Sequence, residues 1–255
     1  MTDIPINLKN ISPQSPRSID YQLANYRQDR RQRLLQALAT VALTSYSVTA
    51  ELCELMEKNL GLMPGNHSVR NAFTKDLPGA GLAITEAQHF IGPSKLGLTR
   101  LTDIGRKVCA EMGLKPVDAE WDQMIRGHNG LQFPRHTLGV LALACQARRY
   151  GWTVVLLPYT GTPVEPDLLV TEKDNEPIYV EFETRARSRD EKWYKNRRWN
   201  TYVAVATFTP AMRKALVLEC KEVPVRGFAT DLQTLTQQER PGLPDTLWQE
   251  KWGRW

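Results

Sequence analysis

Two glutamates stand two residues apart in the segment 178–183, "IYVEFE", and a dense basic segment follows at once. Glu181 and Glu183 alternate with apolar residues, as polar residues on one face of a β-strand do. Paired carboxylates can bind Mg²⁺, which takes hard oxygen ligands and keeps room for water and a substrate phosphate. They can equally form ion pairs with nearby cations. The residue types alone leave both interpretations open.

The residues upstream predict the strand that pairs with this one. Segment 164–171, "VEPDLLVT", is typical of a strand, and a polar turn centred on Asp174 separates it from the glutamates. A hairpin with this centre places Asp167 opposite Glu181, and Glu165 opposite Glu183. The same register gives the hairpin a wholly apolar face, made of Leu168, Val170, Ile178, Val180 and Phe182. We therefore expect one core face and one acidic face, with a metal ion or basic side chains compensating the charge.

Further elements complete a second domain of mixed α/β (α+β) class. An apolar helix is expected from Arg135 to Tyr150, a buried strand near 152–158, and a fourth strand at 202–208. Ser188 and Glu191 form a capping box that would start a helix before the fourth strand. The predicted order is α-β-β-β-α-β. Residues 183–199 hold seven basic and three acidic side chains. The candidate phosphate-binding residues in this region are Arg185, Arg189, Arg197 and Arg198.

The first half of the chain predicts a different architecture. One amphipathic helix is expected between Ser47, as its cap, and Gly61, and after a turn a second helix is expected to begin at Ser68. The second helix has a buried stripe of Val69, Ala72, Phe73 and Leu77. Its outward residues would be Arg70, Asn71, Thr74 and Lys75. A helix, a turn and a second helix with hydrogen-bonding residues outward is what a reader of the DNA major groove requires.

A further helix is expected before Ser47. Its basic residues Arg30 and Arg31 are additional DNA-binding candidates. Taken alone, the run "RQDRRQR" is interpreted more simply as a solvated helix face. The segment 96–116 resembles the last strand and helix of a winged helix-turn-helix domain through its Leu-Thr-x-x-Gly-Arg step, Leu101 to Arg106. We therefore divide the chain into a flexible arm (1–18), a DNA-binding domain (19–116), a linker (117–134) and the second domain (135–255).

The second domain resembles the PD-(D/E)xK nuclease superfamily, through Pro166-Asp167, Glu181 and the α-β-β-β-α-β order. The resemblance implies that Asp167 and Glu181 hold Mg²⁺ and form the catalytic site together with Glu183. Glu183 stands where the motif has lysine, so Lys195 would supply the amine from the following helix.

Both halves together resemble the replication-relaxation proteins of plasmids and other mobile elements. Those proteins pair an N-terminal winged helix with a nuclease-like domain, and their remaining matches here are His136, Lys195 and Tyr202. His136 itself is interpreted as a packed or capping histidine and not as a ligand.

Bulk properties narrow the class of protein. The net charge of +5 is compatible with a polyanionic partner, and no apolar run reaches the roughly 20 residues of a membrane span. Four cysteines without a C-x-x-C pair predict free thiols in a reducing cytoplasm. Three tryptophans near the C-terminus (248, 252 and 255) would dock on the body, on a second copy or on a partner protein. The leading hypothesis is a double-stranded-DNA-binding protein of a mobile element, and the alternatives are an active Mg²⁺-dependent endonuclease and a protein-binding adaptor.

Overall fold

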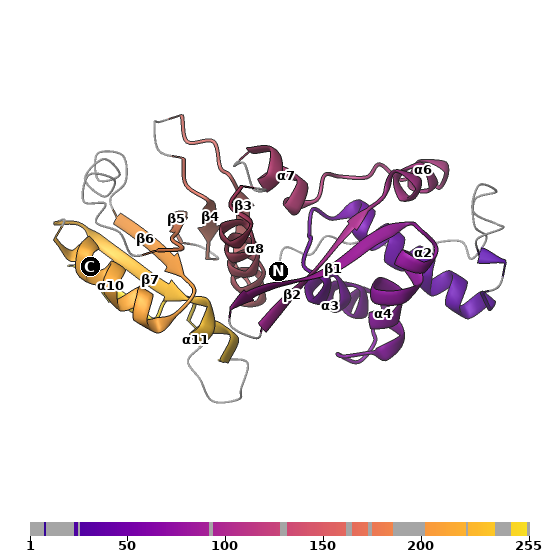
Figure 1. Ribbon diagram of the computed structural model, residues 1–255, viewed down its shortest axis with the longest axis horizontal. Coiled ribbons are helices and arrows are strands. Elements are labelled where there is room, and N and C mark those ends of the chain that lie inside the picture. Colours follow the sequence, from indigo (N-terminus) through magenta and orange to yellow (C-terminus); the bar gives the residue numbers. More distant parts are fainter. Residues whose placement is uncertain are drawn as a thin grey trace. The chain divides into compact units, whose positions relative to one another are not determined.

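The protein has a mixed α/β fold in two compact units (Figure 1). The structure is a computed structural model that describes residues 8, 23–24, 26–91, 94–127, 132–161, 165–172, 175–185, 202–222, 224–237 and 246–253. The first unit comprises Asp3–His89 and Ser94–Gln123, and the second unit comprises mainly Met124–Trp255. The main boundary between the units therefore falls inside the segment expected to be a linker.

Helices and one two-stranded sheet make up the first unit. In chain order they are α2 (Gln28–Leu43), α3 (Thr49–Leu60), α4 (His67–Asn71), the π-helical turn η3 (Ala72–Asp76), α5 (Leu77–Gly79), β1 (Ala83–Ile91), β2 (Ser94–Leu101) and α6 (Asp103–Glu111). Because α4, η3 and α5 follow one another without a break, we call them together the 67–79 helix. Two residues separate the neighbouring strands β1 and β2, a length that only an antiparallel hairpin can bridge. Val48 adds an isolated bridge to Leu98 of β2.

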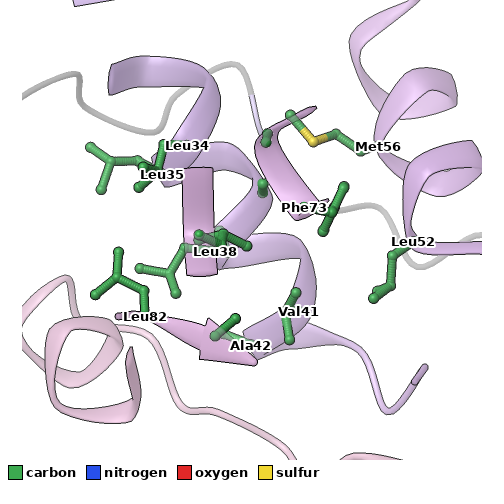
Figure 2. Packing of buried hydrophobic residues seen from close by; sticks show 14 of the residues in the cluster. Leu34, Leu35, Leu38, Val41, Ala42, Leu52, Met56, Phe73 and Leu82 are labelled. Carbon is green, nitrogen blue, oxygen red and sulfur yellow. The ribbon is translucent and has the colours of Figure 1, made fainter. Parts of the chain in front are cut away.

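One continuous apolar core holds the first unit together. The predicted stripe of the 67–79 helix is buried in it, together with Leu34 and Leu38 of α2, Leu52 and Met56 of α3, and Leu82 (Figure 2). Phe73 is fully buried and its neighbours Ala72 and Leu77 are buried with it. Burying a side chain of the size of Phe73 contributes about 2–3 kcal/mol to the stability of the fold. The face opposite this stripe is consequently the one that the 67–79 helix offers to solvent.

The ends of these helices agree only in part with the predicted ones. Gly61 ends α3 in the left-handed conformation, with φ of 67°, as predicted. The cap of the next helix is Asn66 instead of Ser68, since its side chain accepts from the N–H groups of Ser68 and Val69. Ser47 does not cap α3, because its hydroxyl accepts from the N–H of Trp121. A cap needs one particular backbone geometry, which sequence spacing leaves open by a residue or two.

The arm and the linker are more ordered than expected where the structure describes them. Leu8, in the predicted arm, is fully buried, and its carbonyl accepts from the side chain of Gln36. The predicted linker contains α7 (Glu120–Gly127). Its start is held to the first unit by main-chain bonds from Val117 to Ala42 and from Glu120 to Ser45. These backbone contacts have no signature in local composition.

The second unit is built on a six-stranded sheet. Its elements are α8 (Pro134–Arg149), β3 (Thr153–Leu156), β4 (Leu168–Thr171), β5 (Ile178–Phe182), β6 (Tyr202–Thr207), α10 (Pro210–Lys221), β7 (Arg226–Asp231), α11 (Leu232–Gln237) and β8 (Glu250–Trp252). The strand order is β3-β4-β5-β6-β7-β8, in which only the pairs β5-β6 and β6-β7 are parallel. The helix expected to begin at Ser188 lies outside the described residues, as does the centre of the hairpin turn at Asp174.

The hairpin of β4 and β5 has the predicted register from Leu168 to Val170 but departs from it at Asp167, whose N–H donates to the carbonyl of Val180, so that the predicted pairing of Asp167 with Glu181 is wrong. Leu168 pairs with Val180 and Val170 pairs with Ile178, and the whole predicted apolar face is buried. Helix α8 packs on this face so closely that a Cβ on Gly139 would lie 2.2 Å from the ring of Phe182. Helix α10 packs against the opposite face, where Val203 and Val205 of β6 join its cluster. The sheet is thus the middle layer between α8 and α10 (Figure 1).

Two of the three C-terminal tryptophans are used within the chain. Trp252 of β8 covers Gly227, where an added Cβ would lie 1.8 Å from its ring. Trp248 is 4% exposed and contacts the rings of Trp152 and Phe228. Docking on the body, one of the predicted outcomes, is confirmed for these two, and Trp255 lies outside the described residues.

All four cysteines are free thiols. Burial raises the pKa of Cys53 and of Cys109 to about 12, so that both thiols stay protonated and poorly nucleophilic at neutral pH. In the part of the chain that the structure describes, no helix combines the length and the apolar character that a membrane crossing requires.

Candidate functional site

The four predicted outward residues lie on the solvent side of the 67–79 helix. Arg70, Thr74 and Lys75 are exposed and Asn71 is half-buried. They alternate with Val69, Ala72, Phe73 and Leu77, which are fully buried. The helix therefore offers two cationic groups, one amide and one hydroxyl on a surface whose reverse side is anchored in the core. These are donor types that bind phosphate oxygens and base edges.

A carboxylate of α3 fixes the turn between the two helices. Glu57 is 5% exposed and accepts from the main-chain N–H groups of Gly65 and Asn66, at 3.2 and 2.7 Å. Asn66 in turn caps the 67–79 helix. Hydrogen bonds to a charged acceptor are stronger than those between neutral groups. The orientation of the 67–79 helix relative to α3 is thus set by polar contacts as well as by the core.

The predicted DNA-binding residue Arg30 is tied to the same helix from α2. Its guanidinium donates to Asp76 from Nε at 3.2 Å and from Nη2 at 2.5 Å, and it also stacks on Tyr26. Asp76 is buried, and its hydrogen bonds raise the pKa of Arg30 further above its ordinary value. Arg30 remains 57% exposed at its side chain. It holds the 67–79 helix in place and keeps part of its charge at the surface, whereas Arg31 is half-buried.

In the second unit, the hairpin brings Asp167 next to a main-chain donor and a histidine. Oδ2 of Asp167 accepts from the N–H of Phe182 at 2.7 Å and lies 3.2 Å from Nε2 of His136. This contact requires a proton on Nε2 of His136 when the carboxylate of Asp167 is ionised, because an ionised carboxylate only accepts. Asp167 is 3% exposed, and Phe182 directly follows Glu181 in β5. The contact joins the first turn of α8 to the ends of β4 and β5.

The remaining predicted acids are buried, with one exception. Glu181 and Glu183 are 8% and 4% exposed, while Glu165 is exposed. The main chain of Glu183 extends the parallel pairing, because its N–H donates to Ala206 and its carbonyl accepts from the hydroxyl of Thr207. Three of the four acids expected on the acidic face are therefore buried. Buried carboxylates require compensating contacts.

The basic candidates of the second unit fall mostly outside the described residues. Arg185 is described and exposed. The others, which are not described, are Arg189, Lys195, Arg197 and Arg198.

The described residues do not form a complete ligand set for a metal ion. No three His, Cys, Asp or Glu side chains within the described ranges stand close enough to hold one. Oδ2 of Asp167 already accepts from Phe182 and His136, which leaves Oδ1 as its freer oxygen. We therefore derive no chemical step through a metal.

Tyr202, which the resemblance groups with the acids, lies at the other end of the sheet. Its hydroxyl donates to the carbonyl of Pro177, and its ring contacts Phe228. It stands four residues before Ala206, the partner of Phe182, which is about 13 Å along a strand. Burial, and then the charge of Glu176, raises the pKa of Tyr202 to about 12. Its role here is in packing.

Comparison of the chain with family models, with curated proteins and with solved structures found no match.

Proposed function

We propose that the protein binds double-stranded DNA through the 67–79 helix, and that its first unit is a winged helix-turn-helix domain. The order α2, Val48 bridge, α3, 67–79 helix, β1-β2 hairpin supports this architecture, with the hairpin as the wing. The observation that carries the proposal is the exposure of Arg70, Thr74 and Lys75 on a helix whose other face is fully buried. The resemblance to replication-relaxation proteins adds the setting: replication, mobilisation, transposition or transcriptional control of a plasmid or other mobile element.

The second unit is proposed to be a nuclease-derived domain. Its described elements give α8, three antiparallel-paired strands and a fourth strand parallel to the third, in keeping with the expected order. Asp167 lies just before β4 and accepts from the N–H of Phe182, the residue after Glu181 in β5. The contacts of Asp167 with His136 and Phe182 favour a structural role for this carboxylate over a catalytic one. The proposed domain binds or positions other molecules and does not cut DNA.

The DNA-binding proposal predicts the behaviour of two matched double variants. Arg70→Ala/Lys75→Ala is expected to weaken binding of a labelled mixed-sequence duplex about twentyfold at low salt, since two phosphate contacts are lost. Lys214→Ala/Lys221→Ala removes the same charge from exposed positions of α10 and should change the affinity less than twofold. Fluorescence anisotropy measures both. If wild type and both variants fail to bind, the adaptor hypothesis is favoured; equal losses in both variants would indicate binding by net charge alone.

The endonuclease hypothesis is tested separately by cleavage. We expect supercoiled and linear DNA to stay intact with wild-type protein in Mg²⁺ and in Mn²⁺, because Glu183 stands where the nuclease motif has lysine and Oδ2 of Asp167 is engaged by Phe182 and His136. Asp167→Ala serves as the control for contaminating nuclease. Nicking by wild type that disappears in Asp167→Ala would overturn the proposal of a non-cutting domain.

A further inference from the structure

The 67–79 helix contains a main-chain acceptor that its own helix cannot satisfy. In an α-helix the carbonyl of Phe73 would accept from the N–H of Leu77. That N–H is displaced by the π turn η3 and donates to Ala72. The next donor along the chain would come from residue 78, which is proline and has no N–H. The wide turn, which makes room for the proline ring, thus leaves the carbonyl of Phe73 without a helical donor.

A threonine of β1 supplies the missing hydrogen bond. Oγ1 of Thr85 donates to the carbonyl of Phe73 at 2.8 Å. Oγ1 of Thr85 also lies 3.0 Å from Oγ1 of Thr99 on β2, which lies 2.9 Å from Oγ1 of Thr49 on α3. Each hydroxyl has one proton and a carbonyl only accepts. The protons must therefore point one way, from Thr49 to Thr99, from Thr99 to Thr85, and from Thr85 to Phe73.

The surroundings of these three threonine hydroxyls favour the hydrogen bonds between them over hydrogen bonds to water. Thr99 is fully buried and Thr49 is 7% exposed, so that water does not readily replace a missing partner. Gly97 lies against Thr49, and a Cβ there would come within 3.1 Å of its hydroxyl. Hydrogen bonds in a buried chain polarise and strengthen one another. The chain connects the middle of the 67–79 helix to α3 and to both strands of the hairpin.

We propose that Thr85, supported by Thr99 and Thr49, is a positioning residue for DNA binding. It holds the π turn, which presents Thr74 and Lys75, in the arrangement that duplex DNA requires. Thr85 itself does not touch the DNA. This inference rests on the proposed DNA-binding function and adds the contacts that set the geometry of its binding surface.

The test is a double-mutant cycle on duplex affinity. Thr85→Val keeps the shape of the side chain and removes the hydroxyl, and we expect about fivefold weaker binding. Thr85→Ser should restore binding to within twofold. In a Lys75→Ala background Thr85→Val should cost less than twofold, because the group that it positions is gone. Thr40→Val is the matched control, since its buried hydroxyl bonds only within α2, to the carbonyl of Gln36; it should leave affinity unchanged.

A merely structural role for Thr85 would give a different result. Its effect would then multiply with that of Lys75→Ala instead of vanishing in that background, and this outcome would overturn the inference. So would unchanged affinity in folded Thr85→Val. Hydrogen exchange separates this inference from the proposed function: Thr85→Val should speed exchange of the Leu77 amide about tenfold, while α6 is unaffected. Wild-type protein that binds no duplex would refute the proposed function and the role of Thr85 in it, and unchanged Leu77 exchange would refute the positioning of the turn by itself.

Discussion

Gly105→Ala is expected to destabilise the first unit by about 3 kcal/mol, the upper part of the range for overpacking. An added Cβ would lie 2.0 Å from the carbonyl oxygen of Leu82, which is main chain and cannot swing aside. The same oxygen accepts from the N–H of Thr102, whose hydroxyl caps α6 by accepting from the N–H of Gly105. Thr102 also donates to Gly81. The substitution thus disturbs the junction between the 67–79 helix, β2 and α6 at one point.

Urea denaturation combined with peptide-resolved hydrogen exchange reports the two units separately. The first unit should lose protection in Gly105→Ala while the second keeps it. Gly79→Ala is the matched control, because its added Cβ would meet only the hydroxyl of Tyr26, at 3.6 Å. We expect it to be neutral or slightly stabilising. Equal stability of the two variants would contradict the packing described for Gly105.

Asp167→Ala is expected to destabilise the second unit by about 2–4 kcal/mol. The N–H of Phe182 loses its only carboxylate acceptor among the described contacts, and His136 loses a partner on its Nε2 side. Asp167→Asn keeps one oxygen acceptor of similar size, so we expect it to recover part of the loss. Glu165→Ala, at an exposed position two residues earlier, should change the stability by less than about 0.5 kcal/mol.

Thermal and urea unfolding of these three variants decide whether Asp167 is structural. A more stable Asp167→Ala would contradict the account. Carboxylates kept for chemistry commonly lower stability, and their removal commonly raises it. Such a result would favour the endonuclease hypothesis, in which the carboxylates repel one another unless a metal ion is bound between them.

Local periodicity predicted those parts of the fold in which the apolar residues of a helix or strand all lie on one face. The hairpin register followed from the apolar run of Leu168, Val170, Ile178 and Val180, because a one-residue slip would have mixed these residues with the acidic ones and buried charges. The stripe of the 67–79 helix followed for the same reason. Gly61 was predictable as the end of α3 because helices commonly end with a residue in the left-handed conformation, which glycine adopts without steric cost.

Contacts between distant residues were not predictable from the same patterns. Nothing local distinguishes Asp76 as the partner of Arg30, or His136 as the partner of Asp167. Burial of Glu181 and Glu183 likewise depends on what covers them, not on their alternation. Pro78 was a usable signal that we did not interpret: a proline inside a helical pattern leaves carbonyls without donors, and the threonines at 85 and 99 are residues that can supply them.

Beyond the fourth strand we predicted no further strand of the sheet, whereas the structure adds α10, β7, α11 and β8. A buried polar cluster closes this part: Asp231 accepts from Arg213 at 2.5 Å and from the N–H of Thr234 at 2.7 Å. Gln249, just before β8, accepts from Arg213 and from the N–H of Asp231. These contacts join residues as much as 36 positions apart, which is why local composition did not reveal them.

The salt dependence of duplex binding tests the central claim most directly. Each phosphate contact contributes about 0.9 to the slope of log affinity against log salt. If Arg70 and Lys75 bind the DNA backbone, wild type should show a steep negative slope, and Arg70→Ala/Lys75→Ala should reduce its magnitude by about 2. A slope identical in wild type and in this variant would contradict the account, because it would show that the 67–79 helix does not contact DNA.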